Sequence, residues 1–192
     1  MNADRTIYAR YGTRTSMDAD QDVSLEGLTA TMREVLDLHQ GYPQNQNLLV
    51  GKQPRPVDKD RPEQFDKLKA FRTELDYTGK VAKGCIHCHQ LRDAERLEFR
   101  ELAKPMPEKL LFPFPKSEVL GILFDKQTRS TLAEVRSGSA AEKAGLQAGD
   151  QLVRVQGSNI ASEADFQWMT HHLNDLERAL FPKSTKIGAF RA

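Results

Sequence analysis

The sequence predicts an α+β chain in three parts: a strand with a helix, a helical segment, and a small β-barrel that carries two helices. Apolar residues repeat at helical spacing in residues 25–38 and 91–102. Between residues 119 and 157, short alternating stretches are separated by glycine-rich turns, which is typical of small β domains. Prolines concentrate in 43–62 and 105–115, where they interrupt regular structure. We therefore expect these divisions: 1–41, a linker at 42–61, 62–115 and 116–192.

Composition excludes several classes of function. The 192 residues are 39% hydrophobic and 29% charged, enough for one medium core or two small ones. No stretch approaches the roughly 20 apolar residues that a membrane span needs. The 28 basic and 27 acidic residues leave a net charge of +1 and form no long block of one sign. We therefore expect a water-soluble protein with no membrane span and no nucleic-acid partner.

The first 41 residues have the pattern of a strand followed by an amphipathic helix. Residues 6–12 alternate as a half-buried strand does, and residues 2–4 before them have the composition of a hairpin turn. Ser24 can cap a helix that ends near Gln40, with Gly41 as its stop. The expected apolar face consists of Leu25, Leu28, Met32, Val35, Leu36 and Leu38. This order resembles the last part of a thioredoxin-like fold, which implies that the active-site half lies upstream of Met1; a helix that simply packs on the later part of the chain is the alternative.

The two cysteines of the chain lie in the sequence Cys85-Ile-His-Cys88-His89. In this spacing two thiols can add across the vinyl groups of haem, and the adjoining histidine can donate a ring nitrogen to the iron. The motif predicts a covalent haem c site with His89 as the iron ligand.

Helical patterns flank the motif. One is expected to open at Pro62, and another runs from the motif to the break at Lys104-Pro. Together they resemble a minimal cytochrome-c-like segment, which implies thioether anchors at Cys85 and Cys88 and a distal ligand at Met106, before Pro107. Met106 follows His89 by 17 residues, which is shorter than the usual ligand loop. Other candidate distal ligands are His39, His171 and His172.

Other chemistry at the motif stays open. A structural zinc site could use Cys85, Cys88, His89 and His87, but the sequence has no second Cys-x-x-Cys and would take further ligands from far away. A redox dithiol is possible because His87 between the cysteines would stabilise a thiolate. Such pairs usually follow a buried strand, and residues 77–84 are too polar and short for one. A plain disulfide or two free thiols complete the alternatives.

The firmest pattern lies between residues 131 and 155. Strand-like residues 131–136 and 151–155 enclose Gly138-Ser-Ala-Ala and 144–150, Ala-Gly-Leu-Gln-Ala-Gly-Asp. The alanines allow a short helix to pack closely, Gly145 ends it, and Gly149-Asp150 turns into the next strand. These residues resemble the motif of bacterial PDZ domains, in which Asp150 belongs to a turn and has no catalytic role.

The resemblance implies a peptide-binding groove. Its walls would be the strand at Ile122 and a helix from Ser162 to about Leu173, and an extended or C-terminal peptide of another protein would add to the strand. Backbone amides of Leu120, Gly121 and Ile122 would face the peptide carboxylate. Phe166 and Met169 would line the groove, or belong to the core. The last strand, 185–190, looks weak or truncated.

Two functions remain from the sequence. The chain has no Gly-Asx-Ser-Gly turn, no HExxH and no phosphate loop, so we expect no protease or other hydrolase. Haem c attachment requires export, yet residues 1–8 have no signal-peptide pattern, which favours a chain whose beginning is missing. The order of parts resembles exported bacterial proteins predicted in planctomycetes, which implies the periplasm or cell envelope. We expect either a redox or electron-transfer component docked by its PDZ domain, or an adaptor without enzymatic activity; a thiol-disulfide protein is a further alternative.

Overall fold

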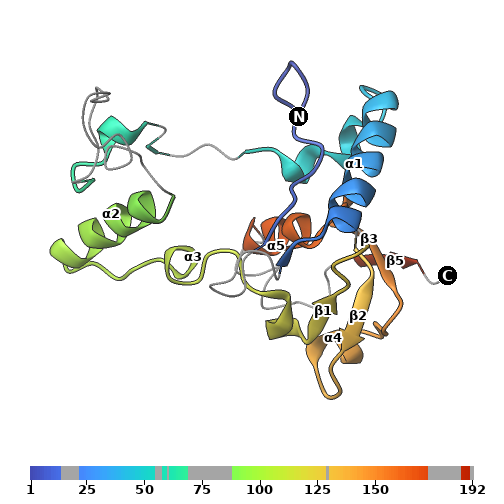
Figure 1. Ribbon diagram of the computed structural model, residues 1–192. Coiled ribbons are helices and arrows are strands. Elements are labelled where there is room, and N and C mark those ends of the chain that lie inside the picture. The colour runs from blue at the N-terminus through green and yellow to red at the C-terminus, as the bar shows by residue number, and fades with distance from the viewer. Residues whose placement is uncertain are drawn as a thin grey trace. The chain divides into compact units, whose positions relative to one another are not determined.

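The computed structural model describes residues 1–13, 22–54, 58–59, 61–68, 88–128, 130–172 and 187–190. These residues belong to two compact units (Figure 1). The first joins Met1–Pro54 to Phe114–Ala192, and the second is Arg55–Pro113. Residues 42–54 thus fall in the same unit as residues 1–41. The divisions expected from the sequence stay predictions.

Helix α1 (Leu25–Gln40) has the predicted boundaries. The Ser24 hydroxyl accepts a hydrogen bond from the backbone N–H of Gly27, and the N–H of Gly41 donates to the carbonyl of Asp37. These two caps satisfy backbone groups that the helix itself leaves free, which fixes where it begins and ends.

The buried face of α1 differs from the expected one. Its buried residues are Gly27, Thr31 and Leu38. A Cβ on Gly27 would lie 2.3 Å from the carbonyl oxygen of Lys126, and the Thr31 hydroxyl donates to the carbonyl of Ala161 at 3.2 Å. Small residues thus let α1 approach the chain closely. The larger apolar residues on the neighbouring stripe are 39–74% exposed: Leu25, Leu28, Met32 and Leu36.

The N-terminal segment is extended but belongs to no strand, contrary to the prediction for residues 6–12. The tight turn expected at 2–4 is present, since the N–H of Arg5 donates to the carbonyl of Asn2 at 3.1 Å. Beyond it, the backbone of Ile7 bonds in both directions with the Gln53 side-chain amide. Side-chain partners therefore replace a sheet ladder. Tyr8 packs in a small cluster with Leu38 and Leu49, beside the short helices η2 (Gln46–Leu48) and η3 (Val50–Lys52).

The described residues within 117–128, 130–172 and 187–190 form the strand-rich part of this unit. Strand β1 (Ile122–Phe124) pairs antiparallel with β2 (Leu132–Val135), and β3 (Gln151–Val155) lies between β4 (Ser158–Asn159) and β5 (Ile187–Phe190). Helices α4 (Ala140–Lys143) and α5 (Glu163–His172) and the 3-10 helix η6 (Ser117–Leu120) complete it. These elements confirm the predicted order, and the weak last strand is present as β5, paired with β3.

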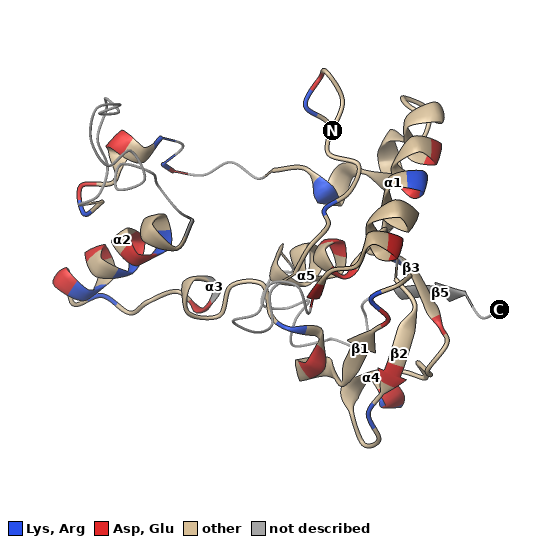
Figure 2. Ribbon diagram, in the orientation of Figure 1, with Lys and Arg blue, Asp and Glu red and all other residues tan. Residues whose placement is uncertain are grey.

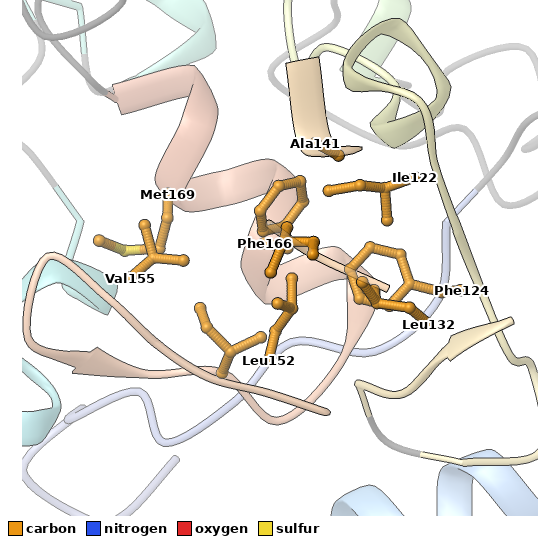
Figure 3. Packing of buried hydrophobic residues seen from close by; sticks show 10 residues of the cluster. Ile122, Phe124, Leu132, Ala141, Leu152, Val155, Phe166 and Met169 are labelled. Carbon is orange, nitrogen blue, oxygen red and sulfur yellow. The ribbon is translucent and has the colours of Figure 1, made fainter. Parts of the chain in front are cut away.

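A single apolar core holds this part together. Figure 3 shows Phe166 of α5 directed toward Ile122 and Phe124 of β1, while Met169 lies beside Val155 of β3. The rings of Phe166 and Phe124 are 5.5 Å apart. The core consists of Ile122, Phe124, Leu132, Ala141, Leu146, Leu152, Val155, Ile160, Phe166 and Met169. Both helices and the strands β1, β2 and β3 thus contribute, as in a small barrel.

The second unit contains α2 (Cys88–Glu101), α3 (Glu108–Leu111) and the single turn η4 (Pro62–Gln64). The helix expected to open at Pro62 ends after that turn, because Phe65 adopts an extended backbone with ψ 90°. Phe65 and Leu68 pack against Ala94. Basic and acidic residues are intermixed along α2 (Figure 2). None of the helices in the described ranges is both long and apolar enough to cross a membrane.

Candidate functional site: the groove between β1 and α5

The outer edge of β1 offers backbone groups for another strand. The N–H of Arg136 donates to the carbonyl of Gly121, and the N–H of Asp125 donates to the carbonyl of Thr131. Backbone groups alternate in direction along an antiparallel strand. The N–H and C=O of Ile122 and Phe124 therefore point away from β2.

The loop before β1 is shaped by Gly121. This residue has a φ of 83°, in the left-handed region, and its N–H donates to the carbonyl of Glu118 at 3.0 Å. The amide that the sequence assigned to a peptide carboxylate is thus bonded within η6. Of the three predicted amides, that of Ile122 lies on the edge of β1 that points away from β2.

Replacing Gly121 with alanine should destabilise the loop. A Cβ at Gly121 would lie 2.2 Å from the Cβ of Ser139, in addition to the left-handed backbone cost of about 1–2 kcal/mol. Gly138→Ala is the matched control, since Gly138 also has a positive φ (75°) but no atom within 4 Å of a Cβ. Urea unfolding should show a larger loss for Gly121→Ala. Equal losses in the two variants would contradict the close contact.

Helix α5 begins as predicted, since the Ser162 hydroxyl accepts from the N–H of Asp165 at 3.3 Å. Of the two apolar residues predicted for the groove, Phe166 is fully buried in the core under β1. Met169 is 6% exposed and faces residues 50–52, since a Cβ on Gly51 would meet its methyl carbon at 2.7 Å. Both residues lie in the core, with Phe166 beneath the strand edge.

The outer face of α5 is polar and is formed by Glu163, Gln167 and His171, spaced by four residues. Phe114, which precedes η6, and Ser117, the first residue of η6, contact the two ends of this face. The Ser117 hydroxyl donates to Glu163 Oε1 at 2.6 Å, and the backbone N–H of Phe114 donates to His171 Nδ1 at 3.2 Å. Sequence reasoning missed Glu163 and Ser117, because no local pattern links two residues so far apart in the chain.

The surroundings of Glu163 disfavour a negative charge on its carboxyl group. Burial raises the pKa of its carboxyl above the usual 4.5, and the nearby carboxylates of Glu118 and Asp22 raise it further, against the hydrogen bonds from Ser117 and Gln167. The folded chain therefore holds this proton more tightly than the unfolded chain.

A pH dependence is expected for Glu163→Gln. The stabilisation that a raised pKa gives is present below pH 4.5 and is lost as the pH rises through the folded pKa. Relative to Glu163→Gln, the wild type should thus lose free energy of unfolding between pH 4 and pH 7. Glu134→Gln, at an exposed position on β2, is the control for general charge effects. If the free energy of unfolding of the wild type instead increases relative to that of Glu163→Gln as the pH rises, the raised pKa of Glu163 is excluded.

The opposite side of α5 carries a buried ion pair. Lys52 Nζ lies 2.8 Å from Asp165 Oδ2, and both side chains are fully buried. Lys52 also donates to the carbonyl of Tyr8, and Asp165 accepts from the N–H groups of Arg10 and Ala161. Burial lowers the pKa of Lys52 and raises that of Asp165, while their attraction opposes both shifts.

Trp168 continues this contact between α5 and the N-terminal residues. Its indole N–H donates to the carbonyl of Gly51 at 3.0 Å, and the guanidinium carbon of Arg10 lies 3.5 Å from the ring centroid. Residues 1–54 are therefore fastened to the helix by buried polar contacts. The sequence offered no signal for these contacts; Asp165 fitted equally well as an ordinary acidic residue in a first helical turn.

The cysteine motif lies mostly outside the described residues. Cys85 and His87 belong to the undescribed stretch 69–87, and Cys88 is the first residue of α2. The side chain of His89 is 69% exposed, with Nδ1 3.9 Å from Asp93. Among the residues that the structure describes, no three His, Cys, Asp or Glu side chains gather as metal ligands.

Met106 is half-buried and lies just beyond the C-terminal end of α2. The N–H of Lys104 donates to the carbonyl of Phe99, and the Arg96 side chain donates to the carbonyl of Leu110. These contacts hold the chain on both sides of Met106 to the later turns of α2, whereas His89 is in its first turn. Ligation of haem iron by Met106 stays a prediction, and so does ligation by His39, whose Nδ1 lies 2.9 Å from the Tyr8 hydroxyl.

The comparisons with known proteins agree with the fold of residues 117–190. Residues 118–177 match the family model of the PDZ domain. This part of the chain is a PDZ domain. A 31-residue stretch of this chain is also 68% identical to protease RseP of Yersinia pestis. The matched stretch covers 16% of this chain and 7% of that protein. The search of solved structures gives no match. The PDZ domain supports a role in protein binding.

Proposed function

We propose that the chain binds an extended peptide of another protein along β1 of its PDZ domain. The supporting observation is the outer edge of β1, where the backbone groups of Ile122 and Phe124 point away from β2. An added strand would pair with these groups, and its alternate side chains would meet the outer face of α5. The binding free energy gained from backbone pairing does not depend on the peptide sequence. Contacts of peptide side chains with the outer face of α5 would instead discriminate among peptides.

A panel of immobilised decapeptides tests this proposal. Half should end in a free carboxylate and half in an amide, because the Gly121 amide is already bonded within η6. We expect a subset to bind the whole chain and to lose binding with Gln167→Trp, which fills the groove. Ala133→Trp, at an exposed position on β2, should bind as the wild type does. Binding that is equal in both variants, or no binding at all, would refute the proposal.

A second proposal is covalent haem c at Cys85, Cys88 and His89. The observation that favours it is that α2 begins at Cys88, with the His89 ring exposed in its first turn. The cysteines would anchor the group and His89 would hold the iron, which supplies reversible one-electron transfer when bound. The PDZ domain would then dock a redox component in the cell envelope.

The haem proposal has a direct test. The chain should be expressed with an export signal in cells that mature c-type cytochromes. A Soret band and a mass increase of one haem that survives denaturation, both lost in Cys85→Ala, would support it. A colourless protein at the mass of the polypeptide would refute it and leave the adaptor function and a redox dithiol, which thiol titration of Cys85 and Cys88 distinguishes.

A further inference from the structure

The segment just before β1 lies along the helix wall of the groove. Its hydrogen bonds reach Glu163 through the Ser117 hydroxyl and His171 through the backbone of Phe114. Those two helix residues are eight positions apart, which is about 12 Å along an α-helix. The segment therefore runs along α5 for two turns and does not merely touch one end.

The Ser117 end of the segment is buried, while Phe114 is 40% exposed and contacts aromatic rings of α5. The Phe114 ring lies 4.4 Å from the ring of His171 and stacks on that of Trp168 at 6.2 Å. Ser117 is 1% exposed. The segment thus presents one aromatic and one hydroxyl side chain to α5, three residues apart.

We propose that residues 114–118 act as an internal ligand of the PDZ domain, which an incoming peptide must displace from α5. This inference rests on the proposed peptide binding. A peptide added to β1 directs alternate side chains at the helix, and the face formed by Glu163, Gln167 and His171 already carries the chain's own segment. Only residues 119–121 separate this segment from β1.

The short connection between residues 114–118 and β1 strengthens their competition with an incoming peptide. A group held by a short connection has an effective concentration in the millimolar range. A free peptide with similar contacts must then reach comparable concentration to bind. The groove is expected to select peptides that contact α5 better than residues 114–118 do.

The test uses a synthetic peptide with the sequence of residues 110–119, Leu-Leu-Phe-Pro-Phe-Pro-Lys-Ser-Glu-Val. The variant Phe114→Ala/Ser117→Ala should release the segment. Its control is Phe112→Ala/Ser137→Ala, which changes the same residue types at exposed positions. Trp168, the one tryptophan in the sequence, reports the result because it stacks on Phe114.

We expect the Trp168 emission to change in the Phe114→Ala/Ser117→Ala variant and not in its control. The synthetic peptide should bind that variant about 10-fold or more tightly than it binds the wild type. Equal affinity for the wild type and the variant, or no binding to either, would overturn the inference. Hydrogen exchange of the amides in η6 gives a second measure, which should speed up when peptide binds.

The two proposals fail in different ways. If panel peptides bind the wild type and the Phe114→Ala/Ser117→Ala variant equally, the internal ligand is refuted and peptide binding stands. If the variant binds only the synthetic peptide of residues 110–119 and no panel peptide, the internal ligand stands and binding of foreign peptides is refuted.

Discussion

Replacing Lys52 with methionine should lower the free energy of unfolding of the first unit by about 3–5 kcal/mol. Methionine keeps most of the volume but leaves the Asp165 carboxylate fully buried without its cation. Removing one partner of a buried ion pair costs much more than the pair contributes, because the remaining charge has lost its water and its counter-charge. Urea unfolding monitored by the fluorescence of Trp168, which lies in the same helix, measures the loss.

Two further variants test the Lys52 prediction more specifically. Lys59→Met removes a partly exposed pair with Glu98 and should cost at most about 1 kcal/mol. The double variant Lys52→Met/Asp165→Asn should recover part of the loss, since it removes the unpaired charge. Its single amide oxygen can still accept from one of the two N–H groups, that of Arg10 or that of Ala161, which bond to different oxygens of Asp165. A single variant as stable as the Lys59 control would contradict the buried pair.

Replacing Phe166 with alanine should cost about 3–5 kcal/mol, because it removes a fully buried ring from the centre of the PDZ core. The cavity would open beneath Phe124, the residue that carries part of the strand edge. Peptide binding should therefore weaken together with stability. Thermal unfolding and the decapeptide panel measure the two effects.

The control for Phe166 is Phe112→Ala, whose ring is 67% exposed. It should change the free energy of unfolding by less than about 0.5 kcal/mol. Phe166→Leu should retain most of the packing and lose less than the alanine variant. If Phe166→Ala unfolds no earlier than Phe112→Ala, the ring cannot be a core residue.

Local features of the sequence predicted local structure well. Ser24 and Gly41 bound α1 as expected, and Ser162 caps α5. Residues 131–155 were recognisable because glycine turns and small alanines constrain the backbone wherever they occur. The strands of the PDZ domain could be predicted from that pattern, whereas its peptide groove stays a prediction.

Contacts between distant parts of the chain could not be predicted. The helix α1 buries Gly27 and Thr31 because Lys126 and Ala161 approach it closely, and no helical pattern contains that information. The pair of Lys52 and Asp165 joins residues 113 positions apart. The contact of Ser117 with Glu163 could not be predicted either, because these residues are 46 positions apart. For the cysteine motif, sequence remains the main evidence, since Cys85 lies outside the described residues.

The first unit is made of two pieces of chain, Met1–Pro54 and Phe114–Ala192, with the second unit inserted between them. Buried bonds such as that of Lys52 to Asp165 hold the two pieces to each other without any help from the covalent link. A protease that cuts once between residues 55 and 113 would therefore produce two polypeptides on a denaturing gel but one particle in solution. The inserted unit could therefore be cleaved in the folded protein while the piece Met1–Pro54 stayed bound to the PDZ domain.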